Sequence, residues 1–134
     1  MTMYGMRGAA AYGRVDVESH VLSASPHKLI NMLFDGALKA IKAAKLHMEQ
    51  KNVPAKAQSI AKALDIVNMG LAAALDKEKG GELAERLEQL YSYVAELLLQ
   101  ANLKNDVAKL DEAAELLEQI GSAWKEIQPQ VEGA

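Results

Sequence analysis

Apolar residues recur every three or four positions in four separate segments of the chain, which is the spacing of one face of an α-helix. Each segment is bounded by residues that start or end helices. The first follows Ser25, an expected amino-terminal cap, and Pro26, which is tolerated at a first helical position. Its apolar stripe comprises Leu29, Leu33, Ala37, Ala40, Ile41, Ala44 and Met48.

The other three segments follow at short intervals. Asn52 and Pro54 mark the start of the second, and the pair Gly80–Gly81 separates it from the third. Asn105 or Asp106 is expected to cap the fourth. The predicted stripes are Ala57, Ile60, Leu64, Val67, Leu71, Ala74 and Leu75 in the second helix, Leu83, Leu87, Leu90, Tyr91, Val94, Leu97, Leu98 and Ala101 in the third, and Leu110, Ala113, Ala114, Leu117, Ile120, Gly121, Trp124 and Ile127 in the fourth.

Short connections make sequential helices antiparallel neighbours. We therefore predict an all-α fold, an antiparallel up-down-up-down four-helix bundle over residues 17–128. The apolar residues are mostly Ala and Leu, with only one Phe and one Trp, which favours helices packed through small side chains. Residues 1–16 are rich in Gly, Met and Tyr without a sustained period, so we expect a flexible amino-terminal arm there. A short tail is expected over residues 129–134.

Composition argues against several function classes. The 15 Lys and Arg residues are interspersed with 18 Asp and Glu residues, so no basic stripe indicates nucleic-acid binding. Cysteine is absent, and no Glu-x-x-His motif is present, so we expect neither a metal nor another cofactor. No catalytic triad or carboxylate pair stands out. We expect a cytoplasmic protein that is not an enzyme and is not inserted into a membrane, since no apolar run approaches the roughly 20 residues of a bilayer span.

The three histidines leave a phosphotransfer domain as one alternative, because such domains are also four-helix bundles. That function needs a solvent-exposed His in the middle of a helix. His27 lies at the second position of the first helix and is interpreted as structural. His20 falls in a short entry segment, and His47 near the core side of the first helix.

Two of the predicted helices carry more apolar residues than one core stripe requires. In the second helix, Ile66, Met69, Gly70 and Ala73 form another stripe away from the core set. In the third, Leu99 and Leu103 lie on an otherwise polar face. The first helix has a wide apolar sector that includes Phe34 and Leu38. Such a surplus indicates a surface that binds a partner segment, although the arm or a second copy of the chain, in a weak homodimer or a structural homo-oligomer, could cover it instead.

Several strings resemble the flagellin export chaperone family, FliS. They are Ala24-Ser25-Pro26-His27-Lys28-Leu29-Ile30-Asn31-Met32-Leu33-Phe34-Asp35-Gly36, Gly80-Gly81-Glu82-Leu83-Ala84 with Leu90-Tyr91-Ser92-Tyr93, and Leu98-Leu99-Gln100-Ala101-Asn102-Leu103-Lys104-Asn105-Asp106. Tyr12, followed by Val15 and Val17-Glu18-Ser19, is also similar to family members. The resemblance covers nearly the whole chain in order.

This resemblance implies a cytosolic chaperone of flagellar type III export. Such a protein binds the disordered carboxy-terminal segment of flagellin, prevents its premature polymerisation and delivers it to components of the export gate. The client segment wraps around the bundle. Tyr12 is then expected to belong to the arm, and Ile66, Leu71, Tyr91 and Tyr93 to the client groove, together with the surplus residues Met69, Gly70, Ala73, Leu99 and Leu103.

Overall fold

The structure, a computed structural model, describes residues 25–127 of the chain. In this range it contains helices α2 (Pro26–Glu49), α3 (Val53–Asp65), η1 (Ile66–Ala72), α4 (Lys77–Lys104) and α5 (Val107–Glu126), and no strand. The predicted arm with Tyr12, the entry segment with His20 and the predicted tail lie outside the described residues.

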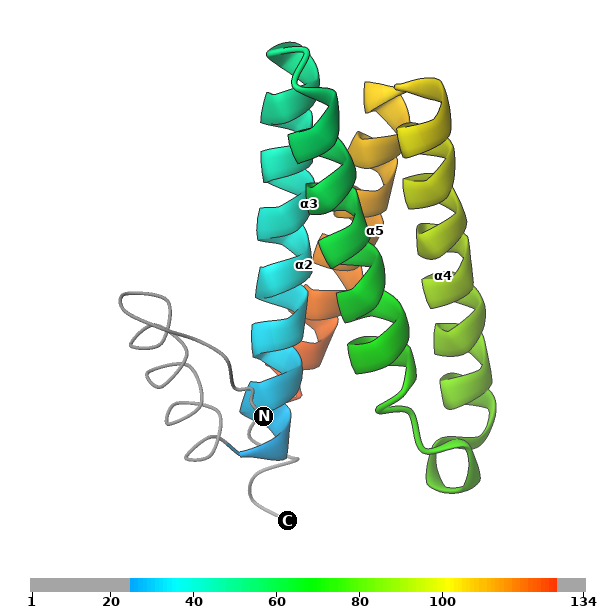
Figure 1. Ribbon diagram of the computed structural model, residues 1–134. Coiled ribbons are helices and arrows are strands. Elements are labelled where there is room, and N and C mark those ends of the chain that lie inside the picture. The colour runs from blue at the N-terminus through cyan, green and yellow to red at the C-terminus, as the bar shows by residue number, and fades with distance from the viewer. Residues whose placement is uncertain (1–24, 128–134) are drawn as a thin grey trace, which may run out of the picture.

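The helices form the predicted bundle. Successive helices run in alternate directions, with α3 and η1 together forming the second of the four (Figure 1). Helix α2 packs against α3 and α5, and α4 packs against α5 and the α3–η1 helix. The seam between α2 and α5 therefore lies on the opposite side of the bundle from the seam between α3 and α4.

Side chains cap the helices where the sequence predicts. The hydroxyl of Ser25 accepts a hydrogen bond from the backbone N–H of Lys28, at 3.1 Å. Asp106 caps α5 by accepting from the backbone N–H of Ala108, at 3.0 Å. Asn105 has a different role, since it ends α4 in the left-handed conformation, with φ of 53°. Asn, unlike most residues, tolerates that conformation.

The core is built from small and aliphatic side chains on the inner faces of all four helices. Its buried members are Phe34, Ala37, Ala40, Ile41, Ala44, Ile60, Ala63, Val67, Leu71, Tyr91, Val94, Leu97, Leu98, Ala101, Leu110, Ala113 and Leu117. Phe34 thus belongs to the core, and the prediction that it forms part of the surplus is wrong. The ring reaches inward because Gly121 on α5 leaves room for it: a Cβ at Gly121 would lie 3.2 Å from the ring.

Two details of the predicted helices are wrong. The second helix is not uniformly α-helical, because its last part, η1, is a π-helix. The third starts earlier than predicted, because a helical turn from Lys77, capped by Asp76, precedes the glycine pair; the break predicted at that pair is confirmed at Gly81, whose φ of 53° and ψ of −129° are not helical. Gly is suited to that backbone conformation because it has no Cβ.

The kinked helix α4 buries most of its predicted stripe, with two exceptions near its start. Its inward positions follow a three-four spacing through Ala84, Tyr91, Val94, Leu98 and Ala101. Leu83 and Leu90 each precede such a position by one residue and so lie on the flank, where Leu83 is 65% exposed. Placing Leu83 and Leu90 in the core was therefore wrong.

Candidate protein-binding surface

The predicted surplus stripe on the second helix is divided between packing and surface. A Cβ at Gly70 would lie 3.0 Å from a methyl group of Leu33, so η1 and α2 are in close contact there. Likewise, a Cβ at Gly36 would lie 3.3 Å from the Ile66 side chain. Ile66 and Gly70 therefore help to form the seam with α2.

The rest of that stripe faces outward. Met69 is 77% exposed, and Ala73 is exposed as well. Leu71, by contrast, is buried in the core. This burial confirms its place in the predicted core stripe, and its role in a client groove stays a prediction.

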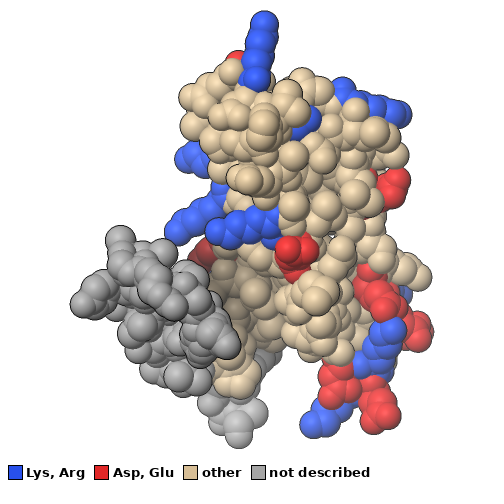
Figure 2. Space-filling view, viewed as in Figure 1, with Lys and Arg blue, Asp and Glu red and all other residues tan. Residues whose placement is uncertain are grey.

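The carboxyl-terminal half of α4 presents the other predicted residues. Leu99 is 52% exposed and Leu103 is 79% exposed. Both side chains remain on the surface although this part of α4 is tied to α3. Figure 2 shows a broad area with few charged side chains over the upper parts of α3 and α4, whereas acidic and basic groups gather around the lower part of α4.

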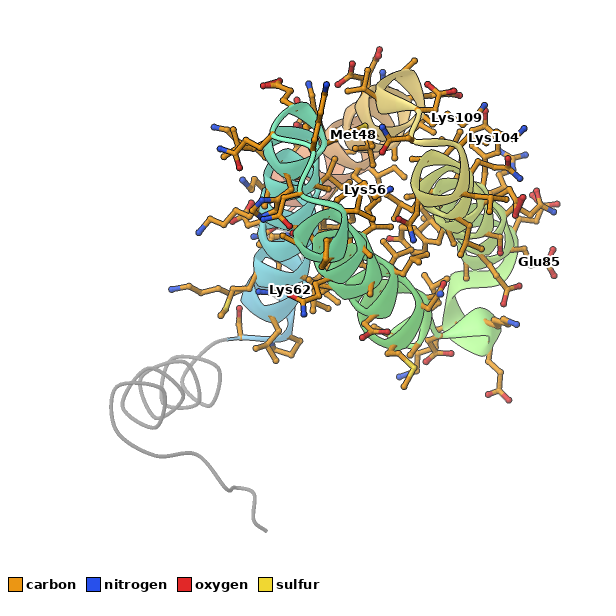
Figure 3. All side chains as sticks on the ribbon, turned by 45° about the horizontal axis from the view of Figure 1, so that its top comes forward. Met48, Lys56, Lys62, Glu85, Lys104 and Lys109 are labelled. Atoms are coloured by element: carbon orange, nitrogen blue, oxygen red, sulfur yellow. The ribbon has the colours of Figure 1, made fainter. Side chains whose placement is uncertain are left out.

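A buried lysine ties α3 to the end of α4. Lys56 is only 5% exposed, and its ammonium group points from α3 toward α4 (Figure 3). It donates to the backbone carbonyl of Asn102 and to the side-chain oxygen of Asn105, each at 3.1 Å. A buried ammonium needs such acceptors, because it loses its hydration on burial. The positions of Leu99 and Leu103 thus depend on a polar contact inside the bundle.

The two predicted tyrosines lie in different environments. Tyr91 is buried, and this burial raises the pKa of its phenol to about 12. Tyr93 is exposed, and its hydroxyl donates a hydrogen bond to the carboxylate of Glu112 on α5, which raises the pKa of Tyr93. Tyr91 is therefore a core residue, as its place in the predicted stripe of the third helix indicated, and of the two tyrosines only Tyr93 is accessible in this structure.

The accessible residues do not form one continuous groove. Leu99 and Leu103 lie near the carboxyl end of α4, while η1, which carries Met69, lies toward the opposite end of the bundle (Figure 1). Sequence reasoning also missed three exposed apolar residues, Leu46, Val53 and Val107, and the exposure of Leu83, Leu90 and Ile127, which it had placed in helical stripes. Leu46 and Val53 follow no helical stripe, so the period gave no signal for them.

The start of α2 and the end of α5 are joined through His27 and Trp124. The rings stack with centroids 4.7 Å apart, His27 Nε2 lies 2.7 Å from the Trp124 carbonyl oxygen, and the indole N–H donates to the His27 carbonyl at 3.0 Å. Asn31 Nδ2 lies 3.3 Å from Nδ1 of the same imidazole. His27 is fully buried, so the structural interpretation is confirmed, and this residue lacks the exposure that phosphotransfer needs.

Within residues 25–127, no three His, Asp or Glu side chains gather into a group that could hold a metal ion. None of the helices in the same range is long and apolar enough to cross a membrane. In this range, the polar side chains described above cap helices or form hydrogen bonds between helices.

Comparison with known proteins identifies the family. The model of the family described as flagellar protein FliS matches residues 8–131. The flagellar secretion chaperone FliS of Salmonella typhimurium is 52% identical over 127 residues, which cover 95% of this chain and 94% of the relative. The protein of the same name in Vibrio cholerae is 42% identical over 93% of this chain and 92% of its own length, and that of Bacillus subtilis is 31% identical over 81% and 80%. With a four-helix bundle, exposed apolar residues on η1 and α4, and relatives that match nearly end to end, the chain belongs to the FliS family of flagellar proteins.

Proposed function

We propose that this protein is a cytoplasmic export chaperone that binds the disordered carboxy-terminal segment of flagellin, prevents its premature polymerisation and delivers it to components of the flagellar export apparatus. Membership of a family whose relatives are named flagellar secretion chaperones supports this function. Holding and releasing a segment requires surface and no bond-breaking chemistry, so the proposed function involves neither catalysis nor a cofactor.

The observation that carries the proposal is the exposure of large apolar side chains at Met69, Leu99 and Leu103. Burying one such side chain against a client contributes roughly 1.5–3 kcal/mol. A disordered segment loses conformational entropy when it binds, and burial of this kind is what offsets that loss. The exposed residues therefore supply the favourable free energy that a chaperone for a disordered segment needs.

The separation of these residues favours an extended client path. A single helix in one groove would need its apolar contacts close together along one seam. Here η1 and the carboxyl end of α4 lie toward opposite ends of the bundle. A segment that passes over more than one helix could contact both regions, and it would meet the hydroxyl of Tyr93 only where the path reaches the seam between α4 and α5.

Substitution of Leu99 and Leu103 tests the proposal. In isothermal titration with a flagellin carboxy-terminal peptide, Leu99→Ser and Leu103→Ser should each weaken binding about tenfold, since each loses the burial of one leucine. Leu46→Ser is a matched control, because Leu46 on α2 is 51% exposed, almost the same as Leu99. Circular dichroism should give the same helicity for all variants.

An equal loss of affinity in the Leu46 control would show that binding is nonspecific. Unchanged affinity in both α4 variants would remove this helix from the client path. A fall in molar mass by light scattering for Leu103→Ser, without a change in peptide affinity, would favour the homo-oligomer instead.

A further inference from the structure

A groove runs along the seam between α2 and α5, on the opposite side of the bundle from the seam between α3 and α4. Its larger hollow has a volume of about 450 Å³ and a floor of Leu38, Ile41 and Ala114. A smaller hollow of about 140 Å³ continues it and shares Leu38 and Glu118 with the first. The two hollows thus form one continuous groove, whose floor is apolar in the larger hollow and whose lining is mixed in the smaller one.

Along the larger hollow the two rims carry opposite charge. The rim on α2 consists of Lys39, Lys42 and Lys45, and the rim on α5 consists of Asp111, Glu115 and Glu118. Ion pairs cross the groove at its ends: Lys45 to Asp111 at 2.6 Å, and Lys125 to Asp35 at 3.8 Å.

The middle of the groove has no such crossing. Between the end pairs, Lys39 and Lys42 on one rim and Glu115 and Glu118 on the other make no ion pair with any described residue. Packing of the bundle does not use these four charges, so they are available to a ligand that lies between them.

We propose that this groove binds an amphipathic helix of a second partner protein, distinct from the flagellin client, with an apolar stripe, an acidic edge and a basic edge. The stripe faces Leu38 and Ala114, the acidic edge faces the lysines of α2, and the basic edge faces the carboxylates of α5. Such an arrangement pairs charges that are otherwise unpaired, and the apolar stripe covers a floor that is otherwise in contact with solvent.

The dimensions of the groove set the size of this helix. Asp35 and Lys45, which mark its two ends on α2, are ten residues apart, or roughly 15 Å at the rise of an α-helix. About three turns of a partner helix fit in that length. A volume of about 450 Å³ takes a row of side chains and not a helix backbone, so the partner lies across the rims with one face inserted.

The rim charges also determine the direction of the bound helix. Turning a helix end for end while its apolar face stays down exchanges its two edges. A helix with one acidic and one basic edge therefore matches the rims in only one direction. Exchanging the two edges in the sequence reverses that direction without abolishing binding.

Three designed 14-residue helical peptides with the same apolar stripe test the proposal against the full chain, by fluorescence anisotropy. One has an acidic and a basic edge, the second has two acidic edges and the third has two basic edges. The mixed peptide should bind about tenfold more tightly than either of the others, because each of those places like charges along one rim. In the double variant Lys39→Glu/Lys42→Glu, the peptide with two basic edges should become the tightest ligand by about the same factor.

The control variant Lys62→Glu/Lys79→Glu has the same net charge as the groove variant, with both changes on exposed residues of α3 and α4. It should keep the preference for the mixed peptide. The proposal fails if the native chain binds none of the three peptides or does not discriminate among them, or if the control variant shifts the preference as much as the groove variant does. A nitroxide on the amino terminus of the mixed peptide should broaden amide resonances at one end of the groove, and at the other end when the edges are exchanged.

The flagellin peptide separates this proposal from the proposed function. Its affinity should be unchanged in Lys39→Glu/Lys42→Glu and lowered in Leu103→Ser. If the groove variant loses flagellin binding, the groove belongs to the client path, and the proposal of a second partner is overturned while the chaperone function stands.

Discussion

The π-helix η1 and the carboxyl-terminal half of α4 both carry apolar residues beyond a single core stripe, yet the fold treats them differently. On η1, Ile66 and Gly70 lie in the seam with α2, and only Met69 among the large side chains is mostly exposed. On α4, Leu99 and Leu103 both remain on the surface. An apolar surplus in the sequence can therefore mean close packing between helices in one place and a free surface in another.

The helical repeat accounts for much of this difference. A projection at 100° per residue assumes 3.6 residues per turn, which holds for α4 after its kink. In a π-helix each hydrogen bond spans five residues, so successive side chains turn by a smaller angle and the faces shift. The shift grows along the seven residues of η1, so it bears more on Gly70, near the end, than on Ile66, the first residue. The projection was reliable for Leu99 and Leu103 and unreliable for Ile66 and Gly70.

The strongest test of the comparison is truncation of a core residue of η1. Leu71→Ala should lower the free energy of unfolding by about 3 kcal/mol, since it removes a buried side chain and leaves a cavity. Met69→Ala, two residues away and exposed, should change it by less than about 0.5 kcal/mol. Urea denaturation followed by circular dichroism measures both. Equally mild effects would contradict the core position of Leu71, which both the predicted stripe and the structure give it.

A second test adds volume on each side of η1. Gly70→Leu should destabilise the fold by about 2 kcal/mol, because the new side chain meets Leu33 across the seam with α2. Ala73→Leu adds volume at the exposed position directly after η1, so it should leave the free energy of unfolding nearly unchanged. Thermal unfolding of both variants distinguishes the two positions. A neutral Gly70→Leu would mean that η1 and α2 can separate at little cost.

Most of the architecture could be predicted from the sequence. The caps Ser25 and Asp106 and the order of the four helices depend on local chemistry and on periodicity, which a single sequence displays. The errors at Phe34, Leu83 and Leu90 have a different origin. The burial of Phe34 depends on the space that Gly121 leaves for its ring on the facing helix. Leu83 and Leu90 lie one residue off the inward positions of the kinked helix α4.

The candidate site was predictable in part for the same reason. Exposure of Leu99 and Leu103 followed from their position among polar neighbours on a regular helix. The helical stripes predicted the burial of Leu71 and Tyr91, whereas the family resemblance assigned both to the client groove, because a likeness in sequence identifies a position and not its accessibility. The opposite charges of the α2 and α5 rims lie on helices distant in sequence, and only the fold brings them together.

Tyr91 and Tyr93 allow the same contrast between core and surface to be measured by pH. The pKa of Tyr91 in the fold is about 12, above the ordinary value of about 10 in the unfolded chain. Its contribution to stability is therefore complete below about pH 10 and is lost as the pH rises toward 12. Between pH 9 and pH 11 the native chain should lose about 1 kcal/mol more unfolding free energy than Tyr91→Phe does.

Tyr93→Phe serves as the control for that measurement. The pKa of Tyr93 is raised by an exposed hydrogen bond with Glu112. Removing the Tyr93 hydroxyl should therefore alter the fall of unfolding free energy at alkaline pH less than Tyr91→Phe does. Chemical denaturation at several pH values gives the three profiles. If Tyr93→Phe flattened the profile more than Tyr91→Phe, the assignment of core and surface would be reversed.

The smallest change in unfolding free energy is expected at the carboxyl end of α4. This change tests whether η1 and the end of α4 are held in place by different kinds of contact. Whereas η1 is positioned by steric contact, the end of α4 is joined to α3 by Lys56, which donates to Asn105. Asn105→Gly keeps the left-handed backbone at no steric cost and removes that acceptor, so it should lower the unfolding free energy by about 1 kcal/mol. In a Lys56→Met background the same change should have little effect, since the donor is already absent. A full 1 kcal/mol loss in both backgrounds would assign the effect to the backbone at Asn105, and the end of α4, with Leu103, would then be positioned independently of the buried lysine.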